Sequence, residues 1–198
     1  MGPIVVVTNE QFHGLFAAWA VGHGIDAQFV LNDGARTNET RLGAIADLQL
    51  ALTTFAGQIG TSDVLVLAGD TLFYDSFHLA SFIEEAQKGA KASGDHILYY
   101  RVQGDAEVSK RGIVEIDPVT SKVTGFLEKP QPTETSSRWA SPAFYLFRNS
   151  TLALIHQVIA FRTKGTPPHT PPPPLNTACS MSPKTNRRRH CWTPLGSS

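Results

Sequence analysis

Cysteine is nearly absent from this 198-residue chain: there are two, Cys179 and Cys191, and both lie beyond residue 162. Disulfides therefore play no part in the first 162 residues. The two cysteines form no Cys-x₂-Cys pair, so their spacing does not match a standard zinc site. Long apolar runs are absent too, since no stretch approaches the roughly 18 continuous apolar residues of a membrane span, and the N-terminus lacks a signal-peptide pattern. We expect a soluble, cytoplasmic protein with no membrane partner.

Acidic residues are missing from one end of the chain. Residues 1–162 contain 12 of the 17 Lys and Arg and all 17 Asp and Glu, a net charge of 12 − 17 = −5. Residues 163–198 contain the other five basic residues, no acid and 8 of the 13 prolines. This composition predicts a folded domain over 1–162 and a disordered, Pro/Arg-rich tail over 163–198. We interpret the tail's run Arg187–Arg189 as a solvated patch and expect no nucleic-acid partner.

An apolar run at residues 64–67 is followed at once by Ala68, Gly69 and Asp70. Four large apolar residues without polar alternation predict a strand buried on both faces. In an open α/β sheet, ligands bind just beyond the carboxyl ends of such strands. Asp70 is therefore the first candidate site residue; the alternative is that its carboxylate caps the following turn.

The remaining apolar patterns predict strands that alternate with helices. The strands are expected at 4–8, 28–31, 97–102 and 143–147, and the helices near 12–22, 42–52, 77–85 and 149–160. Asn9 is positioned to cap the first helix. Residues 111–116 and 123–128 flank a turn-forming segment and predict a β-hairpin. The alternation predicts an α/β fold with a Rossmann-like, mostly parallel sheet flanked by helices.

Three stretches together resemble the sugar-nucleotide pyrophosphorylase family of nucleotidyltransferases. They are Leu42-Gly43-Ala44, Leu67-Ala68-Gly69-Asp70, and Arg111-Gly112-Ile113-Val114-Glu115 followed by Gly125-Phe126-Leu127-Glu128-Lys129-Pro130. The resemblance covers residues 4–160. It implies the nucleotide-diphospho-sugar transferase type of fold. It also implies a reaction in which an NTP transfers its nucleotidyl group to a sugar 1-phosphate and releases pyrophosphate.

The resemblance also implies roles for three charged residues. Asp70 would be catalytic, as the ligand of a Mg²⁺ ion that bridges phosphate oxygens. Lys129 would be catalytic as well, pairing with the phosphate of the sugar substrate, and Glu128 would accept hydrogen bonds from sugar hydroxyls. The alternative for Glu128 and Lys129 is an exposed ion pair at a strand end, which contributes little.

Three small residues would bind substrate by the same resemblance. Gly112 would let the backbone approach the sugar without an intervening Cβ, although a glycine required by the hairpin explains it nearly as well. Gly43 and Ala44 would lie beside the nucleotide at a helix N-terminus. An ordinary tight helix start is the alternative for this pair.

The sequence also departs from the family. The glycine-rich loop that carries Arg, and a second metal-binding carboxylate in a later strand, have no counterpart here, and Ala143 stands where a glycine is common. We therefore expect a partial domain, truncated at both ends, whose own activity is an open question. The alternatives are a non-catalytic or regulatory paralogue that binds sugar phosphate or nucleotide, and an unstable truncated product. A homo-oligomer is left open.

Overall fold

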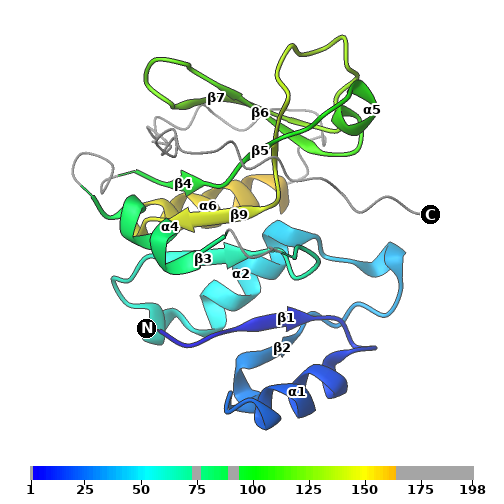
Figure 1. Cartoon of the computed structure of the whole chain (residues 1–198). Helices are drawn as coiled ribbons and strands as arrows, with labels where there is room; N and C mark the ends of the chain where they lie inside the picture. Colours follow the sequence, from blue (N-terminus) through cyan, green and yellow to red (C-terminus); the bar gives the residue numbers. More distant parts are fainter. Residues whose placement is uncertain (1, 73–76, 89–93, 164–198) are drawn as a thin grey trace. The chain divides into compact units, whose positions relative to one another are not determined.

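A computed structural model describes residues 2–72, 77–88 and 94–163, and within the last helix the side chains of 156 and 158–163 are not described. The described residues form two compact units, one of residues 2–62 with 152–163 and one of residues 63–151. Figure 1 shows the elements of both. The predicted tail, with its cysteines and arginine run, lies outside the described residues, so the boundary near residue 162 stays a prediction.

The first unit contains a parallel strand pair. β1 (Val6–Thr8) pairs with β2 (Val30–Asn32), and α1 (His13–Gly22) connects them and contacts both. This is the predicted βαβ arrangement. The other elements of the unit are helical: η1 (Ala27–Phe29), η2 (Asn38–Thr40), α2 (Ala44–Thr54) and α3 (Ala56–Ile59).

The first helix begins where the sequence predicts, but most of its large apolar residues face solvent. Asn9 Oδ1 accepts a hydrogen bond from the Phe12 backbone N–H at 3.1 Å, so Asn9 stabilises the turn before α1, whereas the N-cap position itself is Phe12 and has no side-chain cap. Ala20 is buried, whereas Leu15 and Trp19 are 69% and 48% exposed. The helical spacing thus predicted the element correctly without its large side chains entering the core.

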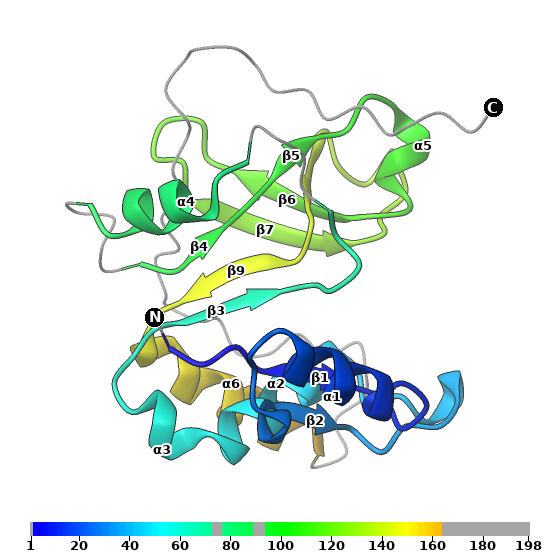
Figure 2. The same cartoon turned by 60° about the horizontal axis from the view of Figure 1, so that its bottom comes forward.

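A three-stranded sheet in the second unit has the order β3-β9-β4 (Figures 1 and 2). β9 (Phe144–Phe147) pairs antiparallel with both β3 (Val64–Leu67) and β4 (His96–Ile97), so β3 and β4 run in the same direction. They are separated in sequence by α4 (Leu79–Ala86), as in a βαβ crossover. The expectation of a mostly parallel sheet is met only in part, because a strand from late in the sequence lies between the two.

The second unit also contains a four-stranded antiparallel sheet, ordered β5-β8-β6-β7. Its centre is the predicted hairpin, formed by β6 (Gly112–Ile116) and β7 (Val123–Glu128). β8 (Trp139–Ser141) pairs with the other side of β6, and β5 (Tyr100–Arg101) pairs with β8. One face forms a small core that also contains α5 (Asp105–Val108); its buried residues are Val102, Val108, Ile113 and Ala140.

The prediction of one continuous strand over 97–102 was wrong. The structure divides this segment into β4 and β5, which belong to different sheets. The Leu98 N–H donates to the Phe144 carbonyl at 2.9 Å, whereas the Val102 N–H donates to the Arg138 carbonyl at 2.9 Å. The apolar and aromatic residues of 97–102 do not reveal this change of pairing partner, because both halves of the segment form half-buried strands.

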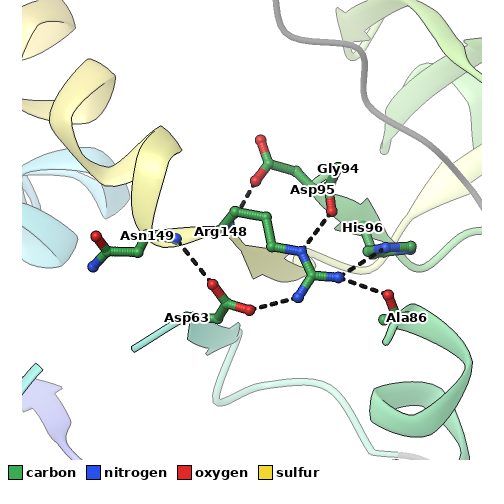
Figure 3. Close-up of polar contacts among 7 residues, drawn as sticks. All are labelled: Asp63, Ala86, Gly94, Asp95, His96, Arg148 and Asn149. Carbon is green, nitrogen blue, oxygen red and sulfur yellow. Dashed lines mark hydrogen bonds and ion pairs between the residues drawn. The ribbon is translucent and has the colours of Figure 1, made fainter. Parts of the chain in front are cut away.

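Arg148, at the end of β9, is 8% exposed and is surrounded by acceptors from three other segments of the second unit (Figure 3). Its guanidinium donates to the carboxylate of Asp63 before β3, to the Ala86 carbonyl at the end of α4 at 2.6 Å, and to the Gly94 carbonyl before β4 at 2.9 Å. One buried cation therefore holds the ends of β3, α4, β4 and β9 together.

The carboxylates of Asp63 and Asp95, near Arg148, also accept hydrogen bonds from the start of α6 (Asn149–Thr163). This helix confirms the one predicted at 149–160. Asp63 Oδ1 accepts from the Asn149 N–H at 3.0 Å, and Asp95 Oδ2 accepts from the Thr151 hydroxyl at 2.8 Å. The first of these bonds satisfies a backbone N–H that a helix N-terminus leaves unpaired. Among the described residues, no helix has the length and apolar content needed to cross a bilayer.

Replacing the cation should destabilise the second unit strongly. Arg148→Met leaves the buried Ala86 and Gly94 carbonyls without the guanidinium that donates to them, and each buried acceptor left unpaired costs about 1–3 kcal/mol. Urea unfolding followed by far-ultraviolet circular dichroism measures the loss. Arg101→Met, at an exposed position of β5, is the control and should change the free energy of unfolding by no more than about 0.5 kcal/mol. Equal effects of the two substitutions would contradict a central role for Arg148.

Candidate functional site

Asp70 lies two residues beyond a backbone contact that fixes the end of β3. The Ala68 N–H donates to the Ala143 carbonyl at 3.1 Å, which continues the β3–β9 pairing. The Asp70 side chain is exposed. The Thr71 hydroxyl lies 3.5 Å from Asp70 Oδ1 and 3.4 Å from the Pro142 carbonyl, at the long limit for either hydrogen bond. The carboxylate thus projects from a fixed strand end toward solvent; the turn that it was alternatively expected to cap includes residues outside the described part.

A row of three residues crosses the four-stranded sheet close to this strand end. Gly112 of β6 is opposite Glu128 of β7 on one side and opposite Ser141 of β8 on the other. Directly opposed residues lie on the same face of a sheet. Ser141 is two residues before Ala143, the partner of Ala68, so short backbone links join this row to the end of β3. The structure therefore places Asp70, Gly112 and Glu128 in the second unit and links them through the connection from β8 to β9.

Gly112 has a packing reason to lack a side chain. A Cβ built on it would lie 2.6 Å from Cζ of Phe126 and 3.3 Å from Oε2 of Glu128. Any larger residue would displace the Phe126 ring. The Phe126 ring thus gives this glycine a packing reason within the hairpin, and its closeness to a sugar stays a prediction.

Glu128 and Lys129 form an open ion pair at the end of β7. Lys129 Nζ lies 3.7 Å from Glu128 Oε1, and the two side chains are 63% and 67% exposed. Such a pair is weak in water, so both groups are free to exchange it for a ligand. The Lys129 backbone has φ 48°, a left-handed conformation, and its N–H donates to the Arg111 carbonyl at 3.0 Å.

Gly43 and Ala44 line a cavity of about 370 Å³ in the first unit. The cavity is bounded by the ends of β1 and β2 and by the first turn of α2; its lining residues are Val7, Thr8, Asn9, Asp33, Arg41, Gly43, Ala44 and Asp47. Gly43 precedes α2 with φ 86°, a conformation in which a side chain is strained. The two predicted residues therefore begin a helix and line a cavity at the carboxyl ends of parallel strands, where ligands bind in α/β folds.

Asp47 and Arg41 line the same cavity, and neither was predicted from the sequence. Asp47 Oδ1 is buried and has no hydrogen-bond partner among the described residues. Burial raises the pKa of this carboxyl, and the neighbouring Asp33 carboxylate raises it further. The sequence did hold a signal for Asp47, since it is a charged residue in the first turn of the helix that Gly43 and Ala44 begin. The first turn of a helix faces whatever the helix N-terminus binds.

Comparison with known proteins assigns the chain to a protein family. Residues 2–168 match the model of the nucleotidyl transferase family. The chain belongs to that family. No curated protein matches the chain at a significant level.

Several solved structures share its fold. A protein from Bacillus anthracis assigned as a glucose-1-phosphate thymidylyltransferase matches with a TM-score of 0.55 and 19% identity, covering 82% of this chain and 56% of its own. An apo UDP-glucose pyrophosphorylase matches with a TM-score of 0.54 and 17% identity, covering 79% and 63%. The UDP-glucose pyrophosphorylase of Acinetobacter baumannii gives 0.51 and 16%, covering 88% and 62%. The chain thus spans less than two thirds of the length of each of these proteins.

Metal-binding side chains do not cluster in the described residues: no group of three or more His, Cys, Asp or Glu could hold an ion there. Asp70 therefore belongs to no such group in the described part of the chain.

Ala143 occupies a strained backbone position at the junction that supports Asp70. Its φ is 55°, and the left-handed region costs a residue with a Cβ about 1–2 kcal/mol. Ala143→Gly should therefore raise the free energy of unfolding by about 0.5–1 kcal/mol after the greater flexibility of glycine in the unfolded chain is counted. Ala106→Gly, at an exposed position of the helix α5, should lower it by about 0.5–1 kcal/mol. Urea unfolding distinguishes the opposite signs, and a loss in both variants would refute the strain.

Removing the Asp47 charge should stabilise the fold at neutral pH. Because the folded-state pKa of Asp47 is raised above its usual value, the folded chain holds a proton there more tightly than the unfolded chain. The stability from the protonated form is fully present below the unfolded pKa, about 3.9, and is lost as pH rises through the folded pKa. Asp47→Asn should thus have a higher Tm than the parent at pH 7, with the difference shrinking toward pH 3.5. Glu84→Gln, exposed on α4, is the control for the change in net charge. A Tm difference between Asp47→Asn and the parent that does not change with pH would contradict the prediction.

Proposed function

We propose that this protein is an NTP:sugar-1-phosphate nucleotidyltransferase, a role supported above all by the placement of Asp70. The carboxylate leaves the end of β3 beside the junction that leads, through Ser141, to the row of Gly112 and Glu128. A carboxylate for a metal-bound triphosphate and a carboxylate for sugar hydroxyls belong side by side in this reaction. The family match is consistent with the same chemistry.

Asp70 fits a Mg²⁺ ion by its donor chemistry. Mg²⁺ is a hard cation that is usually held by one or two carboxylates, several waters and substrate phosphates. Asp70 presents an exposed carboxylate, whose nearest described donor is the hydroxyl of Thr71 at 3.5 Å. When bound, the ion would neutralise charge on the triphosphate. Asp70 would then hold and orient that ion from a rigid strand end.

The proposed reaction requires positioning more than covalent catalysis. A phosphate oxygen of the sugar 1-phosphate forms a new bond to the α-phosphorus of the NTP, and the bond from that phosphorus to pyrophosphate breaks. Lys129 would pair with the sugar phosphate and Glu128 would accept hydrogen bonds from its hydroxyls. Gly43 and Ala44 would lie beside the nucleotide. We place this chemistry in the cytoplasm, where NTPs and sugar phosphates are found.

A second function, binding without catalysis, is favoured by one observation. The sequence contains no glycine-rich segment with Arg that could wrap a triphosphate. Loss of one preorganised charge-stabilising group commonly lowers a rate by about 10²–10³. A chain that grips sugar phosphate through Lys129 but lacks turnover would act as a binding module or regulatory paralogue.

Pyrophosphate release separates these functions. Purified full-length chain is incubated with Mg²⁺, each NTP and a panel of sugar 1-phosphates, and we expect release that falls at least about 10²-fold in Asp70→Asn. Glu84→Gln, which removes an exposed charge on α4, should leave the rate unchanged.

Absence of release from folded wild-type chain would refute the enzyme. Sugar 1-phosphate binding that is lost in Lys129→Ala would then establish the binding module. A broad, non-cooperative melt of the purified chain would instead indicate an unstable product.

A further inference from the structure

Two large aromatic side chains are half exposed on the same sheet face as Gly112 and Glu128. Phe126 is 47% exposed and Trp139 is 38% exposed. Phe126 is opposite Val114 in the β6–β7 ladder, and Val114 is opposite Trp139 in the β6–β8 ladder. The three side chains therefore form a second row, with fully buried Val114 between the two rings.

The aromatic row and the Glu128–Gly112–Ser141 row are neighbours. They are two residues apart along each strand, which is about 7 Å, close to the width of one pyranose ring with its hydroxyl groups. The Phe126 ring and the Glu128 carboxylate both come within contact distance of a Cβ built on Gly112. The two rows thus form one surface that presents aromatic rings and a carboxylate side by side.

The opposite face of this sheet is already occupied. It contributes Ile113 and Ala140 to the small core with Val102 and Val108. β7 alternates strictly between half-buried and exposed residues, and Phe126 and Glu128 are both on its exposed side. Exposing large aromatic rings to water is unfavourable, so a ligand that covers them is stabilised by their burial.

We propose that Phe126 and Trp139 form a platform against which the pyranose ring of the sugar 1-phosphate packs. A pyranose has an apolar face of C–H groups, which carry partial positive charge and match the negative face of an aromatic ring. Its hydroxyls need acceptors, which Glu128 supplies, and its phosphate needs a cation, which Lys129 supplies one residue further on. Tyr99 supports the platform, because its ring makes an edge contact with Trp139 at 5.1 Å between centroids.

This platform rests on the proposed function, since a sugar 1-phosphate is its occupant. It adds a selectivity that the charged residues lack. Lys129 can recognise any phosphate and Glu128 any donor, whereas the rings recognise a molecule with a flat apolar face. A phosphate without a sugar ring should therefore gain nothing from them.

The test compares glucose 1-phosphate with inorganic phosphate. Dissociation constants are measured by calorimetry for full-length wild type, Phe126→Leu and Trp139→Leu. We expect Kd for glucose 1-phosphate to rise about tenfold in each variant, while Kd for inorganic phosphate stays within about twofold. Phe126→Tyr, which keeps a ring, should bind like the wild type. Val119→Ala, at the exposed hairpin turn, is the control.

A second measurement leaves both platform residues intact. In a chain with Trp19→Phe and Trp192→Phe, Trp139 is the remaining tryptophan of the three. Glucose 1-phosphate should change its fluorescence, and inorganic phosphate should not. This readout holds even where a leucine variant folds poorly.

Three results would overturn the platform. Unchanged glucose 1-phosphate binding in both leucine variants of a chain whose wild type releases pyrophosphate would refute the platform and leave the proposed function standing. Equal weakening for inorganic phosphate would show that the rings only maintain the shape of the sheet. A change from dimer to monomer in sedimentation, with sugar binding intact, would show that they face a second copy of the chain. Wild type that neither binds a sugar 1-phosphate nor releases pyrophosphate would refute the proposed function itself.

Discussion

The second unit depends on one buried guanidinium. Arg148 donates to the Asp63 carboxylate and to the carbonyls of Ala86 and Gly94, so the ends of β3, α4, β4 and β9 meet at one cation. Desolvating a charge is expensive, and the planar fork of an arginine with several acceptors is the arrangement that compensates for it. Arg148 directly follows β9, so the same network also fixes where that strand ends against β3, where Val64 is opposite Phe147. The strand register, and not a loop, therefore sets the position of Asp70 at the opposite end of β3.

The antiparallel direction of β9 joins the end of β3 to the four-stranded sheet. A purely parallel neighbour of β3 would place its own carboxyl end beside Asp70. Because β9 runs the other way, its first residues lie there instead, and they follow directly from β8 through Pro142 and Ala143. The metal-binding candidate on one sheet and the sugar-binding candidates on the other are joined by this short connection. The left-handed conformation of Ala143 allows the chain to turn from one sheet into the other within two residues.

The sequence predicted elements whose causes are local, and it missed those whose causes are distant. The hairpin of β6 and β7 follows from alternation and from turn residues in one short stretch, and both were visible. The division of 97–102 between two sheets depends on Phe144 and Arg138 more than 35 residues away, which no local pattern records. Asp70, Gly112 and Glu128 were predicted through motif resemblance and stay predictions, and the ladders show how the backbone links them within the second unit. Arg148, Asp47 and the two exposed rings were missed, because composition around them does not reveal which acceptors, cavity or sheet face they meet.

The side to which the candidate groups point is decided by a turn at the far end of the hairpin. The period of a strand is two residues, so a slip of one residue would move Phe126 and Glu128 to the core face. Asp117 resists such a slip: its Oδ1 accepts hydrogen bonds from the backbone N–H groups of Val119 and Thr120 at 2.9 and 2.7 Å. These bonds also hold the pKa of Asp117 below its usual value. A register irregularity between Glu115 and Ile116 lies between this turn and Gly112, so the pairing of Gly112 with Glu128 reflects both the turn and the bulge. Groups that contact substrate in the proposed function are thereby positioned by residues that do not.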